Sequence, residues 1–253
     1  MEIAFKNPGL RYMVDSIMMF QKDDVSDYWR DSLFRIYSHM DRAHFDSLDT
    51  KKREDYIYEV MKNIYEKELD IITHKLDRYE RNWQAYKEQI EDAFSDAFGI
   101  DCRKLFNDMT CNISLNPIEP RFLATQTFDV FWLSSERDAL GVTLHEIIHF
   151  VWFYVWQRHF GDDVSEYETP HLKWVFSEMV IDPIMRADSR ISGLNPYFAD
   201  GCTYSYFYDM TIDGKPILET LLDMYKRLSI TDFMEQGYDY CLRNEDAIRS
   251  QMK

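Results

Sequence analysis

Cysteine, glycine and proline are all scarce in this sequence. Its 253 residues include eight glycines, seven prolines and only four cysteines, which are Cys102, Cys111, Cys202 and Cys241. None of the cysteines forms a CxxC pair, and their spacing matches no zinc knuckle or redox motif, so we expect mostly reduced, buried thiols. Because 45% of the residues are hydrophobic, the chain can build a large core without cross-links. Any bound metal therefore need not be structural.

Basic side chains are also few compared with acidic ones. Lysine and arginine total 29 against 45 aspartates and glutamates, which gives a formal charge of -16 at pH 7. Such a surface repels the phosphates of nucleic acids and of anionic membranes. We expect neither nucleic acid nor a membrane among the partners.

The sequence shows neither a signal peptide nor a long apolar run. Residues 1 to 20 lack a basic stretch followed by a continuous apolar segment and a small-residue cleavage site. The longest apolar run, from Ile147 to Trp156, is about half of the ~20 residues that span a bilayer, and it contains a histidine. These features favour a soluble, cytoplasmic protein.

Helical patterns dominate the first hundred residues. No glycine or proline lies between residues 10 and 98, and aromatic residues recur at helical spacing. The clearest stripe consists of Trp83, Tyr86, Ile90, Phe94 and Phe98, followed by Gly99 as a plausible C-cap. We predict a helical N-terminal region over residues 1–100. Residues 101–253 then form a second region with a helical C-terminal part, unless the two make one continuous domain.

Residues 111 to 133 have a different composition. The segment FLATQTFDVFW is rich in β-favouring residues, and Pro117 and Pro120 precede it, so we predict a small antiparallel sheet. Ser134 and Ser135 then offer an N-cap for an almost wholly apolar, buried helix from about residue 136 to 159, ended by Gly161. A second helix is predicted from about Pro170 through Asp182, where Pro183 breaks or restarts it. The fold class is α+β and predominantly α-helical.

The motif TLHEIIHF lies in the middle of the apolar helix. His145 and His149 are four residues apart and project from one face, so their imidazoles can bind a single zinc ion. Glu146 follows His145, and its carboxylate can take a proton from a water that the metal activates. The alternative is two core histidines hydrogen-bonded to backbone, with Glu146 at the surface.

A third ligand must come from another element. The candidates are Glu166, Glu168, His171, Glu178 and Asp182. Glu178 and Asp182 are four residues apart in an apolar stretch, which suggests that Glu178 binds the metal and Asp182 accepts an N–H from a ligating histidine. Glu178 could instead be a surface carboxylate, and Asp182 could cap a helix that begins at Pro183. His171 is the second choice of ligand.

The motifs HEIIH at 145–149 and SEMVID at 177–182 resemble those of the gluzincin, or thermolysin-like, zinc metallopeptidases. The resemblance covers about residues 120 to 185 and implies a zincin-like fold with an antiparallel edge strand that holds extended peptide. It also implies zinc ligands at His145, His149 and Glu178, a general base at Glu146, and an orienting role for Asp182. The family pattern places an oxyanion donor after the glutamate ligand, where the candidates are Tyr204, Tyr206 and Tyr208. Two departures are the 28 residues between His149 and Glu178, more than is typical of the family, and the lack of a GxMxN exopeptidase segment.

The resulting hypothesis is a metallopeptidase with one Zn2+ per chain and a peptide or protein substrate. Hydrolysis would proceed by Glu146-assisted attack of a zinc-bound water. Two alternatives remain at this stage. One is another zinc amide hydrolase acting on small substrates, and the other is a binding protein that keeps the scaffold without catalysis.

Overall fold

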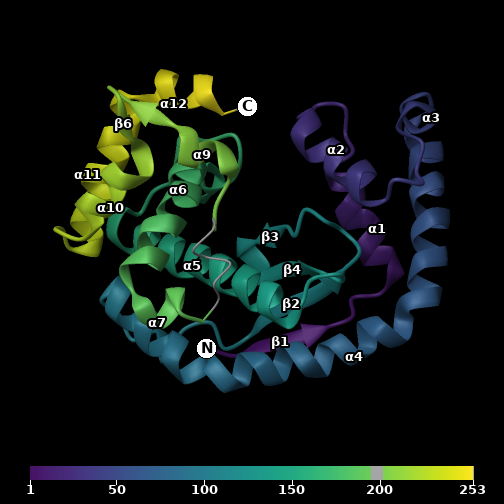
Figure 1. The fold of residues 1–253 in the computed structure, drawn as a ribbon, viewed down its shortest axis with the longest axis horizontal. Coiled ribbons are helices and arrows are strands. Elements are labelled where there is room, and N and C mark those ends of the chain that lie inside the picture. Colours follow the sequence, from purple (N-terminus) through teal and green to yellow (C-terminus); the bar gives the residue numbers. More distant parts are fainter. Residues whose placement is uncertain (195–201, 253) are drawn as a thin grey trace. The chain divides into compact units, whose positions relative to one another are not determined.

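The computed structural model describes residues 1–194 and 202–252, which fall into two compact units. The sheet unit comprises residues 2–84 and 106–139. The helical unit comprises residue 1, residues 85–105 and the chain from residue 140 onward. The long helix α4 (Thr50–Phe98) contributes to both units (Figure 1). The two units interleave along the sequence, and the division at residue 100 stays a prediction.

The sheet unit contains a four-stranded mixed sheet with the order β1-β2-β4-β3. Strands β1 (Ile3–Lys6), β2 (Met109–Ser114) and β4 (Thr127–Phe131) run parallel, and only β3 (Arg121–Phe122) is antiparallel to its neighbour β4. The prediction of a small antiparallel sheet is therefore wrong in strand direction. Strand β4 has neighbours on both sides, so it is not the edge strand that the family resemblance implied.

Helices α1 (Leu10–Met19), α2 (Asp27–Ile36) and α3 (Arg42–Asp46) complete the sheet unit together with α4, and the short η2 (Leu123–Thr125) joins β3 to β4. Helix α1 contacts the sheet through polar groups. The carboxylate of Asp129 on β4 accepts hydrogen bonds from Tyr12 Oη at 2.8 Å, Ser16 Oγ at 3.2 Å and Asn112 Nδ2 at 3.2 Å. A fully buried carboxylate requires such donors, because burial removes its hydration.

Helix α5 (Glu136–Phe160) begins and ends where the sequence predicts. Ser135 Oγ accepts from the Asp138 backbone N–H at 3.2 Å, while the Asp138 carboxylate accepts from the Ser135 backbone N–H at 3.3 Å, which is a reciprocal cap. Gly161 follows with a φ of 66°. Helix α5 is long and apolar enough to cross a membrane by length and composition alone. However, 83% of its most apolar 18-residue stretch is buried inside the protein, as in a core helix.

Helix α6 (Leu172–Ala187) is buried at every residue from Leu172 to Met185. Pro183 lies inside this helix, so the prediction that it breaks or restarts the helix is wrong. Proline removes one backbone hydrogen bond, but burial on all sides holds the segment helical. Rings of Phe176 on α6, Trp152 on α5 and Phe233 on α11 (Ile230–Arg243) meet at centroid distances of 5.4 to 6.0 Å and form the centre of the core.

Of the remaining elements of the helical unit, one precedes α5, one connects α5 to α6, and the others follow α6. Helices α10 (Ile217–Tyr225) and α11 (Ile230–Arg243) pack against α6. The shorter elements are η1 (Cys102–Lys104), η3 (Val164–Tyr167), α7 (Ser189–Ser192), α9 (Ser205–Asp209), the hairpin of β5 (Thr211–Ile212) and β6 (Lys215–Pro216), and α12 (Glu245–Gln251).

Candidate metal centre

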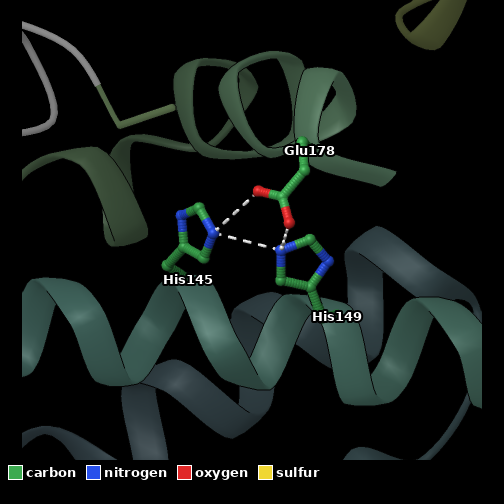
Figure 2. A group of neighbouring side chains, drawn as sticks. All are labelled: His145, His149 and Glu178. Atoms are coloured by element: carbon green, nitrogen blue, oxygen red, sulfur yellow. Dashed lines mark hydrogen bonds and ion pairs between the residues drawn. The ribbon is translucent and has the colours of Figure 1, made fainter. Parts of the chain in front are cut away.

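Two helices of the helical unit bring three metal-binding side chains together. His145 and His149 project from one face of α5, and Glu178 reaches them from α6 (Figure 2). The Nε2 atoms of the two histidines lie 3.0 Å apart. One carboxylate oxygen of Glu178 lies 3.3 Å from His145 Nε2, and the other lies 3.3 Å from His149 Nε2. The two histidines and the glutamate therefore lie next to one another, although 28 residues separate His149 from Glu178 in the sequence.

The donor set fits a zinc ion in both chemistry and size. Two imidazole nitrogens and one carboxylate are a common ligand set of catalytic zinc, and one ligand atom from each residue lies within 4.8 Å of the others. In a tetrahedron with bonds of about 2.0–2.1 Å, neighbouring ligand atoms are about 3.3–3.4 Å apart. The two Nε2 atoms lie 3.0 Å apart, and each lies 3.3 Å from a different carboxylate oxygen of Glu178, so small movements of the side chains would reach that length. Their roles as ligands stay a prediction.

The electrostatics of the cluster favour positive charge at its centre. Burial by itself would raise the pKa of Glu178, but the charges of His149 and His145 and their hydrogen bonds hold it well below its usual range. Burial would lower the pKa of His145, but its hydrogen bond to Glu178 and the nearby carboxylate of Glu146 outweigh this and raise it to about 8. The buried carboxylate of Glu178 faces two imidazoles that can each be positively charged when protonated. A divalent metal ion at the same place would supply comparable positive charge.

The three side chains differ in their access to solvent. The side chain of His149 is fully buried and that of Glu178 is 4% exposed, whereas that of His145 is 21% exposed. Of the three, His145 is therefore the one with the most contact with solvent. Glu146 is buried, and its charge acts on His145. Its role as general base stays a prediction.

Aromatic side chains support His149 from behind. The ring of Phe153, one turn further along α5, stacks on the imidazole with an interplanar angle of 13°. Tyr167 of η3 stacks on Phe153 with ring centroids 4.3 Å apart, and its hydroxyl lies 2.7 Å from both Gln157 Oε1 and Asp162 Oδ1. Neither Phe153 nor Tyr167 was predicted from the sequence to have a functional role. The signal for Phe153 was available, because a residue four positions after His149 shares its helical face.

Asp182 does not hold His145 directly. The Nδ1 atom of His145 lies 2.9 Å from the backbone carbonyl of Cys202. The Asp182 carboxylate instead pairs with Arg186, whose Nε lies 2.7 Å away, and accepts from the hydroxyl of Tyr208 at 3.2 Å. The alternative assignment of Asp182 as an N-cap also fails, because the residue lies inside α6.

The three candidate tyrosines separate into two groups. Tyr208 places its hydroxyl between Asp182 and the backbone N–H of Cys202, at 3.2 Å and 2.8 Å. Tyr204 and Tyr206 stack on each other with ring centroids 5.3 Å apart and an interplanar angle of 3°. Tyr208 thus belongs to the surroundings of His145, whereas an oxyanion role for any of the three stays a prediction.

The other candidate ligands lie apart from the cluster. His171 is exposed at the start of α6, Glu166 forms an ion pair with Lys173, and Glu168 is exposed. Within residues 1–194 and 202–252, the group of side chains that could hold a metal ion comprises His145, His149 and Glu178. The four cysteines are buried, and none of them forms a disulfide.

The candidate centre is thus built by two buried helices, α5 and α6, and by one short segment at Cys202. It combines two histidines and a glutamate, a set of donors that can bind zinc, with the buried carboxylate of Glu146 next to His145, the most exposed of the three. No family model, no curated protein and no solved structure matches this chain.

Proposed function

We propose that this chain is a zinc-dependent hydrolase of peptide bonds, related in its chemistry to the gluzincins. His145, His149 and Glu178 would hold one zinc ion. The observation that supports this most is the group of three side chains from α5 and α6, with contacts of 3.0 to 3.3 Å between them. When bound, zinc supplies Lewis-acid polarisation of a carbonyl and makes water a nucleophile near neutral pH.

The expected roles of the protein side chains differ with their burial. His149 and Glu178 are shielded from solvent, so they serve as fixed ligands, while the partly exposed His145 borders the side from which substrate arrives. Glu146 is the buried carboxylate beside His145. It would accept a proton from the attacking water and pass it to the departing amine, as general acid–base catalysis requires.

A developing oxyanion needs a hydrogen-bond donor as well. The hydroxyl of Tyr208 is committed between Asp182 and Cys202. Tyr204 and Tyr206 therefore remain the candidates for this donor. The net charge of -16 favours a peptide or protein substrate over nucleic acid, and a cytoplasmic location fits the same proposal.

The first experiment is metal analysis of protein purified without chelators, which should give about one zinc per chain. Glu146→Gln should keep the zinc and lose hydrolysis of a peptide library by roughly 10²-fold or more, because it removes the proton acceptor alone. His145→Ala should lose both zinc and activity. His159→Ala, which removes an exposed histidine of the same helix, should change neither.

Several outcomes would decide against the proposal. Wild-type protein that neither contains zinc nor takes it up would refute the metal site. Hydrolysis of small acyl amides without hydrolysis of peptides would indicate the small-substrate alternative. Zinc binding without any hydrolysis would leave a binding protein on the same scaffold.

A further inference from the structure

The hydrogen bonds around His145 extend beyond the metal ligands. We propose that Tyr208 is a positioning residue, which holds His145 in its ligand orientation by fixing the backbone of Cys202. This inference rests on the proposed function, because it concerns the outer partner of a proposed zinc ligand. It departs from the family expectation, in which Asp182 would orient a histidine directly.

The first step is the contact between His145 and Cys202. Nδ1 of the imidazole lies 2.9 Å from the backbone carbonyl oxygen of Cys202. A carbonyl oxygen only accepts hydrogen bonds, so Nδ1 carries the hydrogen. In the neutral ring Nε2 then presents its lone pair toward His149 and Glu178, which is the form that binds a metal. The position of this carbonyl therefore decides both the tautomer and the plane of the ring.

The second step is what fixes the carbonyl. The backbone N–H of Cys202 donates to Tyr208 Oη at 2.8 Å, and the Tyr208 hydroxyl donates to Asp182 Oδ1 at 3.2 Å. Asp182 is held by Arg186 at 2.7 Å, one turn along α6. Tyr208 thus connects the backbone N–H of Cys202, which is attached to the same Cα as the carbonyl, to a buried carboxylate on the helix that carries Glu178.

A neighbouring contact ties the same segment to α6 at a second point. The hydroxyl of Thr203 donates to the backbone carbonyl of Glu178 at 2.8 Å. The segment Cys202–Thr203 is therefore bonded both to α6, which carries Glu178, and to the side chain of His145. Of these contacts, only the Tyr208 hydroxyl both accepts from the Cys202 backbone and donates to α6, so it is the group whose removal should free the carbonyl.

The test is the metal affinity of Tyr208→Phe, which deletes the hydroxyl and keeps the ring. We expect its zinc affinity, measured by competition with a chromophoric chelator, to fall roughly 10-fold to 100-fold, as for other outer partners of metal ligands. Its Co2+ absorption spectrum should also change in position or intensity, because the histidine is no longer held in one orientation. Tyr225→Phe, a matched change in the same unit outside these contacts, should leave affinity and spectrum as in the wild type.

Two further measurements separate positioning from general destabilisation. Urea unfolding of the metal-free proteins reports any loss of stability, which by itself would not alter the Co2+ spectrum. Asp182→Asn keeps an oxygen that can accept from Tyr208, so it should retain zinc affinity more closely than Tyr208→Phe. If the wild type binds zinc and Tyr208→Phe has the same zinc affinity and the same Co2+ spectrum, this inference is overturned while the proposed function stands. A wild type that binds no zinc would overturn it together with the proposed function.

Discussion

Asp129 provides a quantitative test of how the sheet unit accommodates a buried acid. Its carboxylate is fully buried on β4 and accepts hydrogen bonds from Tyr12, Ser16 and Asn112. Burial disfavours the charged form more strongly than these hydrogen bonds favour it. The result is a pKa raised from 3.8 to about 6.

The direction of the pH effect follows from this raised pKa. The folded state binds the proton of Asp129 more tightly than the unfolded state does. The stabilising contribution is therefore complete below about pH 4 and is lost as the pH rises through about 6. A shift of about 2 pKa units corresponds to about 3 kcal/mol of unfolding free energy between these limits.

The perturbation is Asp129→Asn, which cannot ionise. Urea unfolding of the variant and the wild type between about pH 4 and about pH 7.5 gives the difference in unfolding free energy at each pH. We expect that difference to move in favour of the variant by about 2–3 kcal/mol as the pH rises. The size of the stability difference at any one pH also depends on the hydrogen bonds that the amide introduced by Asp129→Asn makes. The test is therefore how the difference between variant and wild type changes with pH.

A matched control is Asp24→Asn, which removes one negative charge from an exposed position in the same unit. It accounts for the general effect of net charge on stability. Parallel stability curves for Asp129→Asn and the wild type over the whole range would refute the reasoning. They would show that the hydrogen bonds to Asp129 fully compensate for its burial.

Two further changes test the packing and the helix ends. Gly237→Ala on α11 places a Cβ 2.6 Å from Cζ of the buried Phe176, so we expect a loss of about 1–3 kcal/mol in urea unfolding, although alanine favours helices. In a Phe176→Leu background the same change should cost less, and a net gain in stability from Gly237→Ala alone would contradict the packing. Gly161→Ala at the end of α5 meets no atom within 4 Å, but its φ of 66° should cost about 1 kcal/mol in thermal unfolding. An unchanged melting temperature would show that this backbone conformation relaxes freely.

The parts of the fold that the sequence predicts well depend on local signals. Helix α5 was predicted to within about one residue, because Ser135 caps its start and Gly161 permits its left-handed end. The pairing of His145 with His149 is also local, since it follows from helical periodicity. Glu178 could be proposed because a carboxylate in an apolar helix needs a partner.

The parts that were missed depend on contacts between distant segments. Strand β1 has four residues, and its parallel partner β2 begins at Met109, so no local pattern could reveal its direction. The continuation of α6 through Pro183 depends on burial by surrounding elements, which overrides the local preference of proline. Chain direction and tertiary burial are properties of the whole unit.

The surroundings of His145 illustrate a second kind of limit. Its outer partner is the backbone carbonyl of Cys202, and every residue type carries such a group. A motif of side chains such as ExxxD therefore cannot specify it. The sequence offered Tyr208 as a candidate oxyanion donor, which stays a prediction, but it gave no sign of the hydrogen bonds to Cys202 and Asp182.

The 28 residues between His149 and Glu178 were the main departure from the thermolysin-like spacing, and helix geometry accounts for most of them. Eleven residues complete α5 after His149, and six residues of α6 precede Glu178. At about 1.5 Å per residue, the chain travels about 16 Å away from the site and returns about 9 Å along α6. The connection from residue 161 to 171 must both turn the chain and cover the difference.

That connection is anchored in a way that supports the site. Asp162 accepts from the indole of Trp156 at 3.0 Å and pairs with Lys173 near the start of α6, so the first residues of the connection are fixed to both helices that it joins. Between these anchors, η3 delivers Tyr167 onto Phe153, which in turn stacks on the imidazole of His149. The residues that lengthen the gap thus pack against His149, a proposed ligand. The spacing that set this sequence apart from thermolysin-like enzymes is for this reason compatible with a closed metal centre.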